Sequence, residues 1–471
     1  MAAVVPENID PALLARVGSI RRPTGDLPLD ADLSHLPGKS GLWTGLNYLR
    51  GMKTRGVEHQ LEVGARHGKV FRYQLANIPI VAVFGSEEVG EVGRNSEGIY
   101  STSLGWRYFF GAIDEASSTF DSPTGVDFEP HREVRKIFQP GFSGEALSSY
   151  TDIAAAGFAR EIDGWVERGG VHFKPSVRRL MANVANRIFI GREDAESAAL
   201  FDGGMANLWE STTALVQHDL LSPRWRRGRK SWAAMFRRLR DDVDEQRSSQ
   251  RDNLYSLMLR AEDKADWLDD DTLVRLFLNL MAAAFDTTSH GTVSMAYLLA
   301  KHPEWQERLR DEALGLGREP LRYDQVKQLP MHDWVWKETL RLLPVANALP
   351  RRALRETHLG GHRIPAGAFV WAHLGPPMRD PARWTEPARF DPERFAPERA
   401  EDRKQGGGYM PFGSGPHACI GARLSTIEAV TFWHTLLTRC RIRLAKPYEG
   451  HHQYGPLGVV SGGVDLVLER L

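Results

Sequence analysis

The stretch FGSGPHACIG, residues 412–421, places one of the chain's two cysteines in a loop that contains three glycines. Loops rich in glycine give up helix and strand so that their backbone can approach another group closely. The run after Gly421 has apolar residues at helical spacing, which predicts a helix to about Leu437 and puts Cys419 just before its N-terminus. Unpaired N–H groups and the helix dipole favour negative charge there, so we expect a lowered pKa for the Cys419 thiol.

Three kinds of site fit a cysteine in this position. A thiolate can attack an electrophile, with His417 as its base, in a cysteine-nucleophile hydrolase. It can also bind a metal, but Cys440 lies beyond the predicted helix, which excludes zinc and iron–sulfur sites and leaves haem, whose iron needs one axial protein ligand. The third alternative is a buried structural cysteine, and the glycines count against it.

The composition favours one large domain. The chain has 471 residues, of which 42% are hydrophobic, and neither a linker nor an internal repeat divides it. Its 60 basic and 60 acidic residues balance, which removes a global electrostatic argument for a nucleic-acid partner. We therefore expect a single domain over residues 1–471 and no nucleic acid.

The N-terminus and the longest apolar stretch indicate a soluble, cytoplasmic protein. Glu7 and Asp10 stand where a signal peptide would need a basic end and an apolar run. Residues 273–285 are interrupted by Arg275 and Asn279 and fall short of the roughly 18 residues of a transmembrane anchor. Two cysteines form no disulfide framework, so a reducing compartment fits.

The periodicity predicts a mainly α (α+β) protein. Alternating apolar residues in KVFRYQLANIPIVAVFG, residues 69–85, predict a β-hairpin with its turn at Ala76–Asn77. The final VSGGVDLVLERL, residues 460–471, is interpreted as another hairpin, and HRIPAGAFVWA, residues 362–372, as short strands. Helical spacing predicts helices near residues 145–165, 174–190, 228–262, 271–301, 303–317, 331–343 and 421–437.

The cysteine loop resembles the haem-binding loop of the cytochrome P450 haem-thiolate monooxygenases of the soluble bacterial type. FGSGPHACIG matches the family pattern F-x-x-G-x-[R/H]-x-C-x-G, and the matching residues are Phe412, Gly415, His417, Cys419 and Gly421. The resemblance implies heme b with Cys419 as the axial thiolate. It also implies a large helical body with small β-sheets, and haem between the long central helix and the cysteine-loop helix.

A second motif implies a structural brace behind the cysteine loop. In WVWKETLRLLP, Glu338 and Arg341 share one helix face and can pair, although by itself such a pair is usually solvated. The resemblance places Arg394 of FDPERF as the third member of a Glu–Arg–Arg cluster. Guanidinium groups bond carboxylates bidentately, so the cluster would serve folding and haem retention.

A third motif lies in the predicted central helix. Within LMAAAFDTTSHGTVSMAYLLA, residues Ala283, Asp286 and Thr287 match the family's [A/G]-G-x-[D/E]-T pattern, with Ala284 where glycine is usual. A mid-helix threonine can bond the carbonyl four residues back, here that of Ala283, and bend or open the helix. The resemblance implies that Asp286 and Thr287 are catalytic and relay protons to bound dioxygen.

A fourth set of residues is expected to bind the haem propionates. His131 and Arg135 of FEPHREVRKIF lie one helical turn apart, and the resemblance adds Arg351 and His417. Four cationic or hydrogen-bonding groups would neutralise two buried carboxylates. The resemblance covers residues 65–471, with residues 1–64 as an N-terminal segment.

The resemblance implies a monooxygenase that inserts one oxygen atom of O2 into a lipophilic small molecule, such as a sterol, terpenoid or fatty acid. Electrons would come from a separate partner, a ferredoxin-type protein being usual for such chains. A haem-thiolate peroxygenase and a non-catalytic haem sensor are the alternatives, and the presence of both Asp286 and Thr287 argues against each.

Two further stretches are candidates for ligand contact. Residues 103–120 hold an aromatic cluster that could line an apolar pocket or simply pack in the core: Trp106, Tyr108, Phe109 and Phe110. Residues 223–240 interleave basic residues with Trp225, Trp232 and Phe236. We interpret this stretch as a solvated basic face, with peripheral membrane contact as the second interpretation.

Overall fold

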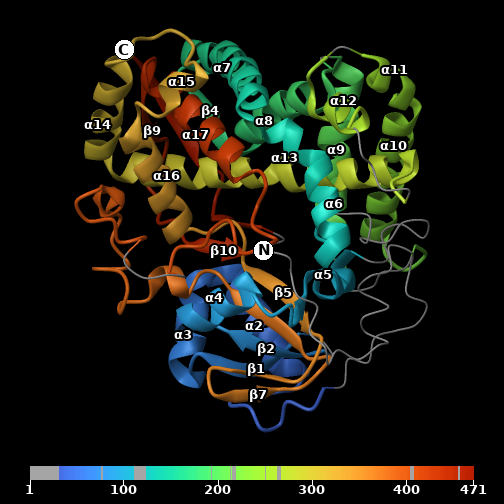
Figure 1. Ribbon diagram of the computed structural model, residues 1–471. Coiled ribbons are helices and arrows are strands. Elements are labelled where there is room, and N and C mark those ends of the chain that lie inside the picture. The colour runs from blue at the N-terminus through green and yellow to red at the C-terminus, as the bar shows by residue number, and fades with distance from the viewer. Residues whose placement is uncertain are drawn as a thin grey trace.

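The computed structural model describes residues 31–75, 78–110, 123–192, 194–212, 214, 219–249, 251–261, 267–403, 408–454 and 457–471. Helices form most of the molecule, and a sheet-rich region lies at one end of the helical body (Figure 1). The predicted α+β architecture, dominated by helices, is confirmed.

The largest sheet has five strands in the order β1-β2-β8-β5-β3. The antiparallel pairing of β1 with β2 confirms the predicted hairpin, whose turn lies outside the described residues. β2 pairs in parallel with β8, a strand almost three hundred residues further along the chain. The strands and the helices near them are β1 (Val70–Leu75), β2 (Ile78–Val83), β3 (Tyr100–Ser101), β5 (Ala348–Ala353), β8 (Phe369–His373), α2 (Leu42–Arg55), α3 (Val57–His67) and α4 (Ser86–Arg94).

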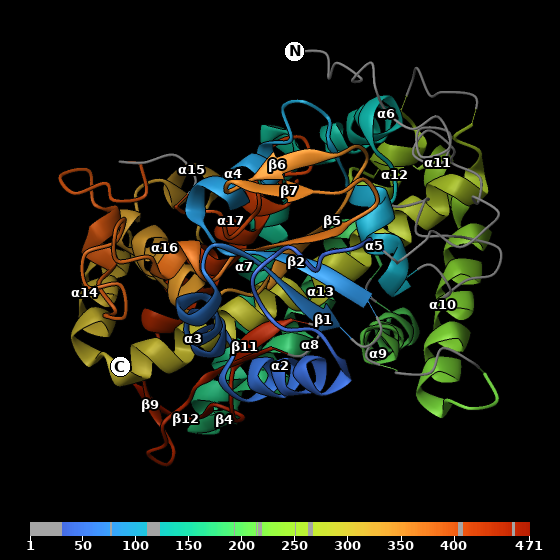
Figure 2. The same ribbon diagram turned by 90° about the horizontal axis from the view of Figure 1, so that it is seen from below.

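The helical body surrounds α13 (Asp270–Lys301), a helix of 32 residues that is buried along most of its length. Asp269 caps it by accepting from the Thr272 N–H. Seen from below, the five-stranded sheet covers part of this body, and α9 and α10 lie to one side of the sheet (Figure 2). The other helices are α5 (Thr102–Phe110), α6 (Phe128–Phe138), α7 (Gly144–Glu167), α8 (Phe173–Ile190), α9 (Ala195–Ser211), α10 (Pro223–Asp241), α11 (Val243–Ser248), α12 (Leu254–Leu259), α14 (Pro303–Leu314), α15 (Tyr323–Val326), α16 (Pro330–Leu342) and α17 (Ala422–Leu437), with 3₁₀ turns η2 (Gln139–Phe142), η3 (Pro377–Arg379) and η4 (Pro392–Phe395).

Two predictions of secondary structure are wrong. The single helix expected over 228–262 is three helices, α10 to α12, and the N-cap residue Asn253 begins the last of them by accepting from the Ser256 N–H at 2.9 Å.

The predicted C-terminal hairpin does not form, because the chain turns between two sheets at Val464, whose φ is 49°. The strands concerned are β11 (Gly458–Val460), which pairs with β10 (His452–Tyr454), and β12 (Asp465–Arg470), which pairs with β4 (Gly170–His172) and β9 (Cys440–Leu444); β6 (Thr357–Leu359) and β7 (His362–Ile364) form a separate pair.

The basic stretch 223–240 forms the amphipathic helix α10. Trp225 and Trp232 are buried against the helical core, 1% and 5% exposed, whereas its arginines lie mostly on the outer face. These tryptophans therefore stabilise packing rather than touch a membrane or a nucleic acid. Within the described ranges, no helix has the length and apolar character needed to cross a bilayer.

Candidate active site

The cysteine loop needs glycine for two physical reasons. Gly413 and Gly415 have φ values of 71° and 72°, in the left-handed region that side chains disfavour. A Cβ at Gly415 would also stand 2.3 Å from the Gly93 carbonyl oxygen, at the end of α4. The loop is closed by the Cys419 N–H, which donates to the Phe412 carbonyl at 2.9 Å. This backbone brings Cys419 to the N-terminus of α17, which begins at Ala422 after the cap Gly421.

The Cys419 thiol opens onto a cavity, but its environment differs from the one expected. The thiol is accessible through the cavity while protein atoms surround it closely, and this burial raises its pKa. The N–H groups of Gly421 and Ala422 and the charge of Arg135 oppose the shift without reversing it. The predicted lowering of the Cys419 pKa is therefore wrong, because the effect of burial on the pKa is larger than the opposite effect of the helix N-terminus. A bound metal ion would hold the thiolate form.

Cys440 has a different setting. It begins β9, is fully buried, and its thiol donates to the Leu436 carbonyl at 3.5 Å. Burial raises its pKa to about 12, and it is not among the described residues that line the cavity. Cys440 is thus a structural cysteine, and Cys419 is the one that can meet a ligand.

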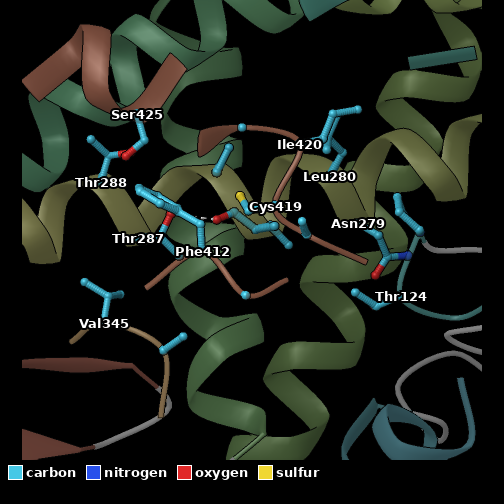
Figure 3. Close-up of a pocket in the computed structure, with 18 of the residues that line it drawn as sticks. Thr124, Asn279, Leu280, Thr287, Thr288, Val345, Phe412, Cys419, Ile420 and Ser425 are labelled. Carbon is cyan, nitrogen blue, oxygen red and sulfur yellow. Dashed lines mark hydrogen bonds between the residues drawn. The ribbon is translucent and has the colours of Figure 1, made fainter. Parts of the chain in front are cut away.

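The cavity has a volume of about 400 Å³ and lies between the cysteine loop and α13 (Figure 3). Its wall is largely apolar and includes Trp106, the one member of the predicted aromatic cluster whose side chain is described. The other three members lie outside the described side chains. Further lining comes from α8, α9, α10 and α13, namely Met181, Ala185, Phe189, Leu208, Trp209, Trp232, Leu280, Ala282, Ala283 and Ala284.

One edge of the cavity is polar, and the structure brings all four predicted propionate ligands to it. The rings of His131 and His417 are 3.8 Å apart, and His417 Nε2 lies 3.2 Å from Asp127 Oδ1. Burial lowers the pKa of His131 to about 3 and lowers that of His417, so both histidines are neutral hydrogen-bonding groups. Arg135 and Arg351 are the cations of this edge.

These two arginines supply the test of whether an anionic cofactor fits. Arg351 is 2% exposed, and its Nε has no hydrogen-bond partner among the described residues. Burial lowers its pKa to about 10, and Asp127, the nearby acid, already accepts bonds from residues 101 to 103. Arg135 bonds the Ala418 carbonyl at 2.8 Å beside Cys419. A buried cation without a paired carboxylate fits a cofactor that carries carboxylates of its own.

The donor set around Cys419 also limits the kind of metal centre. Within the described ranges no three His, Cys, Asp or Glu side chains gather to hold a metal ion. An ion at Cys419 would therefore take its remaining ligands from a cofactor, as the iron of haem does.

The central helix presents Thr287 to the cavity but turns Asp286 away from it. The Thr287 hydroxyl donates to the Ala283 carbonyl at 3.0 Å, the bond that the motif predicts, and α13 continues through this turn without interruption. Asp286 is 5% exposed and pairs with Arg178 of α8 at 2.7 Å; it is not among the described lining residues. Arg178 also pairs with Asp202 of α9 at 2.6 Å. The predicted acid and alcohol are adjacent in sequence but face different surroundings.

A carboxyl that the sequence interpretation missed lines the same cavity. Glu428 of α17 is 8% exposed, bonds the Thr288 side chain, and burial raises its pKa to about 7. Thr288 in turn donates to the Ser425 hydroxyl at 3.2 Å, joining α13 to α17 (Figure 3). The sequence carries one signal, a glutamate inside the apolar run TIEAV, which belongs to none of the four motifs.

The structure also brings Glu338, Arg341 and Arg394 together. Arg341 bonds both oxygens of Glu338, at 2.7 and 2.9 Å, and Arg394 reaches Glu338 Oε1 at 3.2 Å. All three side chains are completely buried. Arg394 is bonded further to Glu401 at 2.9 Å, so the cluster is saturated with partners.

The fold and the residues around this cavity fit a haem-thiolate type of protein, and comparisons with known proteins show the family. The family model "Cytochrome P450" matches residues 36–461. The chain belongs to the cytochrome P450 family. It is therefore a monooxygenase that carries haem with a cysteine thiolate ligand, acts on small molecules, and uses O2 and a redox partner.

Relatives and solved structures support the same family. The putative cytochrome P450 136 of Mycobacterium tuberculosis is 29% identical over 94% of this chain and 90% of its own length. The cyclooctat-9-en-7-ol 5-monooxygenase of Streptomyces melanosporofaciens is 28% identical over 71% of this chain and 75% of its own. The retinoic acid bound cyanobacterial CYP120A1 superposes with a TM-score of 0.81 at 20% identity, covering 93% of this chain and 99% of that one. This last likeness shows the P450 fold.

Proposed function

We propose that Cys419 is the axial thiolate ligand of the haem and that the enzyme inserts one oxygen atom of O2 into a lipophilic small molecule. The observation that carries the proposal is the position of the Cys419 thiol, in the wall of an apolar cavity whose polar edge holds unpaired buried arginine. When bound, the haem supplies the activation of O2. Phe412, Gly415 and Gly421 shape the loop that presents the sulfur.

The polar edge would hold the carboxylates of the haem. Arg351 Nε and the guanidinium of Arg135 donate to them, and His131 and His417 add neutral hydrogen bonds. Asp127 fixes the ring of His417 through the 3.2 Å contact. This arrangement binds and orients the cofactor without leaving charge uncompensated.

Thr287 and Asp286 would have different roles in proton transfer: Thr287 would donate a proton at the cavity, and Asp286 would replace it. Thr287 Oγ1 faces the cavity and donates to the Ala283 carbonyl at 3.0 Å; by turning away from that carbonyl, its hydroxyl would present a proton to the cavity. The buried Asp286 carboxylate, held by Arg178 of α8, would return that proton from solvent when the ion pair opens. The apolar lining excludes stray water from the reacting atoms.

The electron donor would be a small acidic ferredoxin-type protein. Lys136 on α6 and Arg423 at the start of α17 are exposed close to the residues that hold the cysteine loop. Opposite charges steer such partners and orient them. This chain would work as a single domain over residues 1–471 in the cytoplasm, where its two cysteines, both free, stay reduced.

A terpenoid, sterol or fatty acid would suit the cavity. Its lining is predominantly aliphatic and aromatic, as in sites for lipophilic molecules. The Streptomyces relative is named for a reaction on cyclooctat-9-en-7-ol, a hydrocarbon skeleton that carries one hydroxyl group.

The variant Cys419→Ser tests the proposal, with Cys440→Ser as its matched control. We expect Cys419→Ser to lose the thiolate-type red-shifted Soret band of the ferrous–CO form and to lose turnover, whereas Cys440→Ser retains both. The same spectrum and the same turnover in Cys419→Ser would show that the proposal is wrong. A colourless wild-type protein that alkylation inactivates would instead support the hydrolase alternative.

One observation keeps a peroxide-driven enzyme as the second candidate. Asp286 is paired with Arg178 and is not among the described residues of the cavity wall, so it does not deliver the protons that O2 reduction consumes directly into the cavity. Product formation from hydrogen peroxide at a rate equal to or above that with NADH and a ferredoxin chain would favour the peroxygenase. Coupled NADH consumption favours the monooxygenase and excludes a non-catalytic sensor.

A further inference from the structure

One amide interrupts the apolar wall that α13 offers to the cavity. Asn279 lies beside Leu280 and one helical turn before Ala283, and all three line the cavity. In Figure 3 its side chain stands at the end of the cavity away from Thr288 and Ser425, near Thr124. An amide in such a wall costs free energy unless a partner satisfies it.

The hydrogen bonding of Asn279 fixes which of its atoms is available. Asn279 Nδ2 donates to the Arg275 carbonyl, one turn back in the same helix, at 3.0 Å. A carbonyl accepts only from the NH2 group, so this bond sets the orientation of the amide. Among the described residues the side chain makes no second bond, which leaves Asn279 Oδ1 as a free acceptor at the cavity wall.

Several other polar groups of the cavity are engaged near the cysteine loop, whereas Arg351 Nε and Thr102 Oγ1 have no partner among the described residues. The Thr287 hydroxyl bonds the Ala283 carbonyl, Thr288 bonds Ser425, and Arg135 bonds the Ala418 carbonyl. An acceptor on the N-terminal half of α13 is thus separate from the groups that would hold the cofactor or handle protons.

We propose that Asn279 Oδ1 accepts a hydrogen bond from a hydroxyl group of the substrate, so that the substrate is a lipophile carrying an alcohol. This inference rests on the proposed function and deepens it. Asn279 and Thr287 are eight residues apart on one helix, about 12 Å along its axis at 1.5 Å per residue. The hydroxyl is therefore an anchor, and the oxidised carbon lies at the level of Thr287, about 12 Å further along the helix axis.

Binding to the haem-loaded enzyme tests the anchor without requiring turnover. The probes are dodecanol, menthol and pregnenolone, each titrated against its own methyl ether by isothermal calorimetry. The ether keeps the skeleton but has no hydrogen to donate. We expect at least one alcohol to bind roughly five- to tenfold more tightly than its ether, the value of one hydrogen bond.

Variants assign the preference to Asn279. Asn279→Leu keeps the volume and removes the acceptor, so the ratio of alcohol to ether affinity is expected to fall to about one. Leu280→Met is the matched control, because it changes the neighbouring lining residue without polar atoms and shifts both affinities together. Asn279→Asp retains an acceptor and is expected to keep the preference, which guards against a misfolded leucine variant.

Three results would overturn the inference: no alcohol binds, every alcohol and ether bind equally to the wild type, or the preference survives in folded Asn279→Leu. The proposed function is tested by a different measurement, the carbon-monoxide spectrum. Calorimetry reports the contact with the hydroxyl group whichever ligand the iron has, so the two proposals can fail independently. The protein could show an alcohol preference that depends on Asn279 and yet lack the thiolate spectrum. That result would support the hydroxyl anchor and contradict the haem-thiolate assignment.

Discussion

The brace and the cavity edge are both buried and polar, yet they differ in how completely their groups are bonded. In the brace, the carboxylate of Glu338 is bonded by Arg341 and Arg394, and the arginines have further partners. At the cavity edge, Arg351 Nε has no partner among the described residues. A saturated cluster stabilises the fold by itself, whereas an unsaturated one is complete only with a ligand.

The largest effect is expected from breaking the saturated cluster. Glu338→Gln keeps the size of the side chain but removes the carboxylate that the two buried guanidinium groups share, so that Arg341 loses its acid partner and Arg394 keeps Glu401 at 2.9 Å. Removing one partner of a buried ion pair costs about 3–5 kcal/mol. We expect the free energy of unfolding, measured with urea, to fall by that order and haem content to fall with it.

A surface ion pair is the control for the brace. Glu469 pairs with Arg443 at 2.8 Å, and both side chains are more than half exposed. Glu469→Gln is expected to leave the urea transition almost unchanged. Equal losses in the two variants would mean that the brace contributes no more than a solvated pair, and the contrast between the two buried regions would disappear.

A smaller effect is expected from Glu428, the carboxyl of the cavity wall. Burial raises its pKa to about 7 from an ordinary value of 4.5. The folded state thus binds the Glu428 proton more tightly than the unfolded state does. The stabilisation that this proton gives is fully present below about pH 4.5 and is lost as the pH rises through 7. The change is up to roughly 3 kcal/mol.

Urea unfolding as a function of pH measures this effect. Wild-type stability is expected to decline between about pH 5 and 8, and Glu428→Gln, which cannot ionise, should remove most of that slope. The exposed Glu469→Gln should keep it. A wild-type profile that is flat or rises over this range would show that Glu428 is ionised in the folded protein.

The smallest change in stability, and the sharpest contrast with the brace, is expected at Arg351. Arg351→Met keeps the apolar stem but removes a buried charge that has no paired carboxylate. In haem-free protein the free energy of unfolding should stay constant or rise by about 1 kcal/mol. In the haem-loaded protein the same variant should release haem faster, as followed by transfer to an excess of apomyoglobin.

The outcome that contradicts this account is a loss of stability in haem-free Arg351→Met comparable to that of Glu338→Gln. Arg351 would then belong to a structural cluster like the brace. An unchanged rate of haem transfer would remove Arg351 from the cofactor site.

Part of the site could be predicted because its signals are local. The glycines at 413 and 415 mark left-handed backbone, and the Thr287-to-Ala283 bond follows from helix geometry. The contacts of Asp286 could not be predicted in this way. Its partner Arg178 stands on α8, 108 residues earlier, and no spacing rule links the two. Glu428 was missed for the same reason, since its pKa depends on burial against α13.

The amino-acid sequence by itself determined the cysteine loop, the main helices and the first hairpin, because periodicity and glycine positions are properties of neighbouring residues, and the resemblance of its motifs to a known family implied the cofactor. Only the tertiary structure decided that β12 joins β9 and β4, that Asp286 turns to Arg178, and that burial raises rather than lowers the pKa of Cys419. These outcomes depend on which distant segments exclude water from a group, and the free energy of that exclusion is set by the packed fold as a whole.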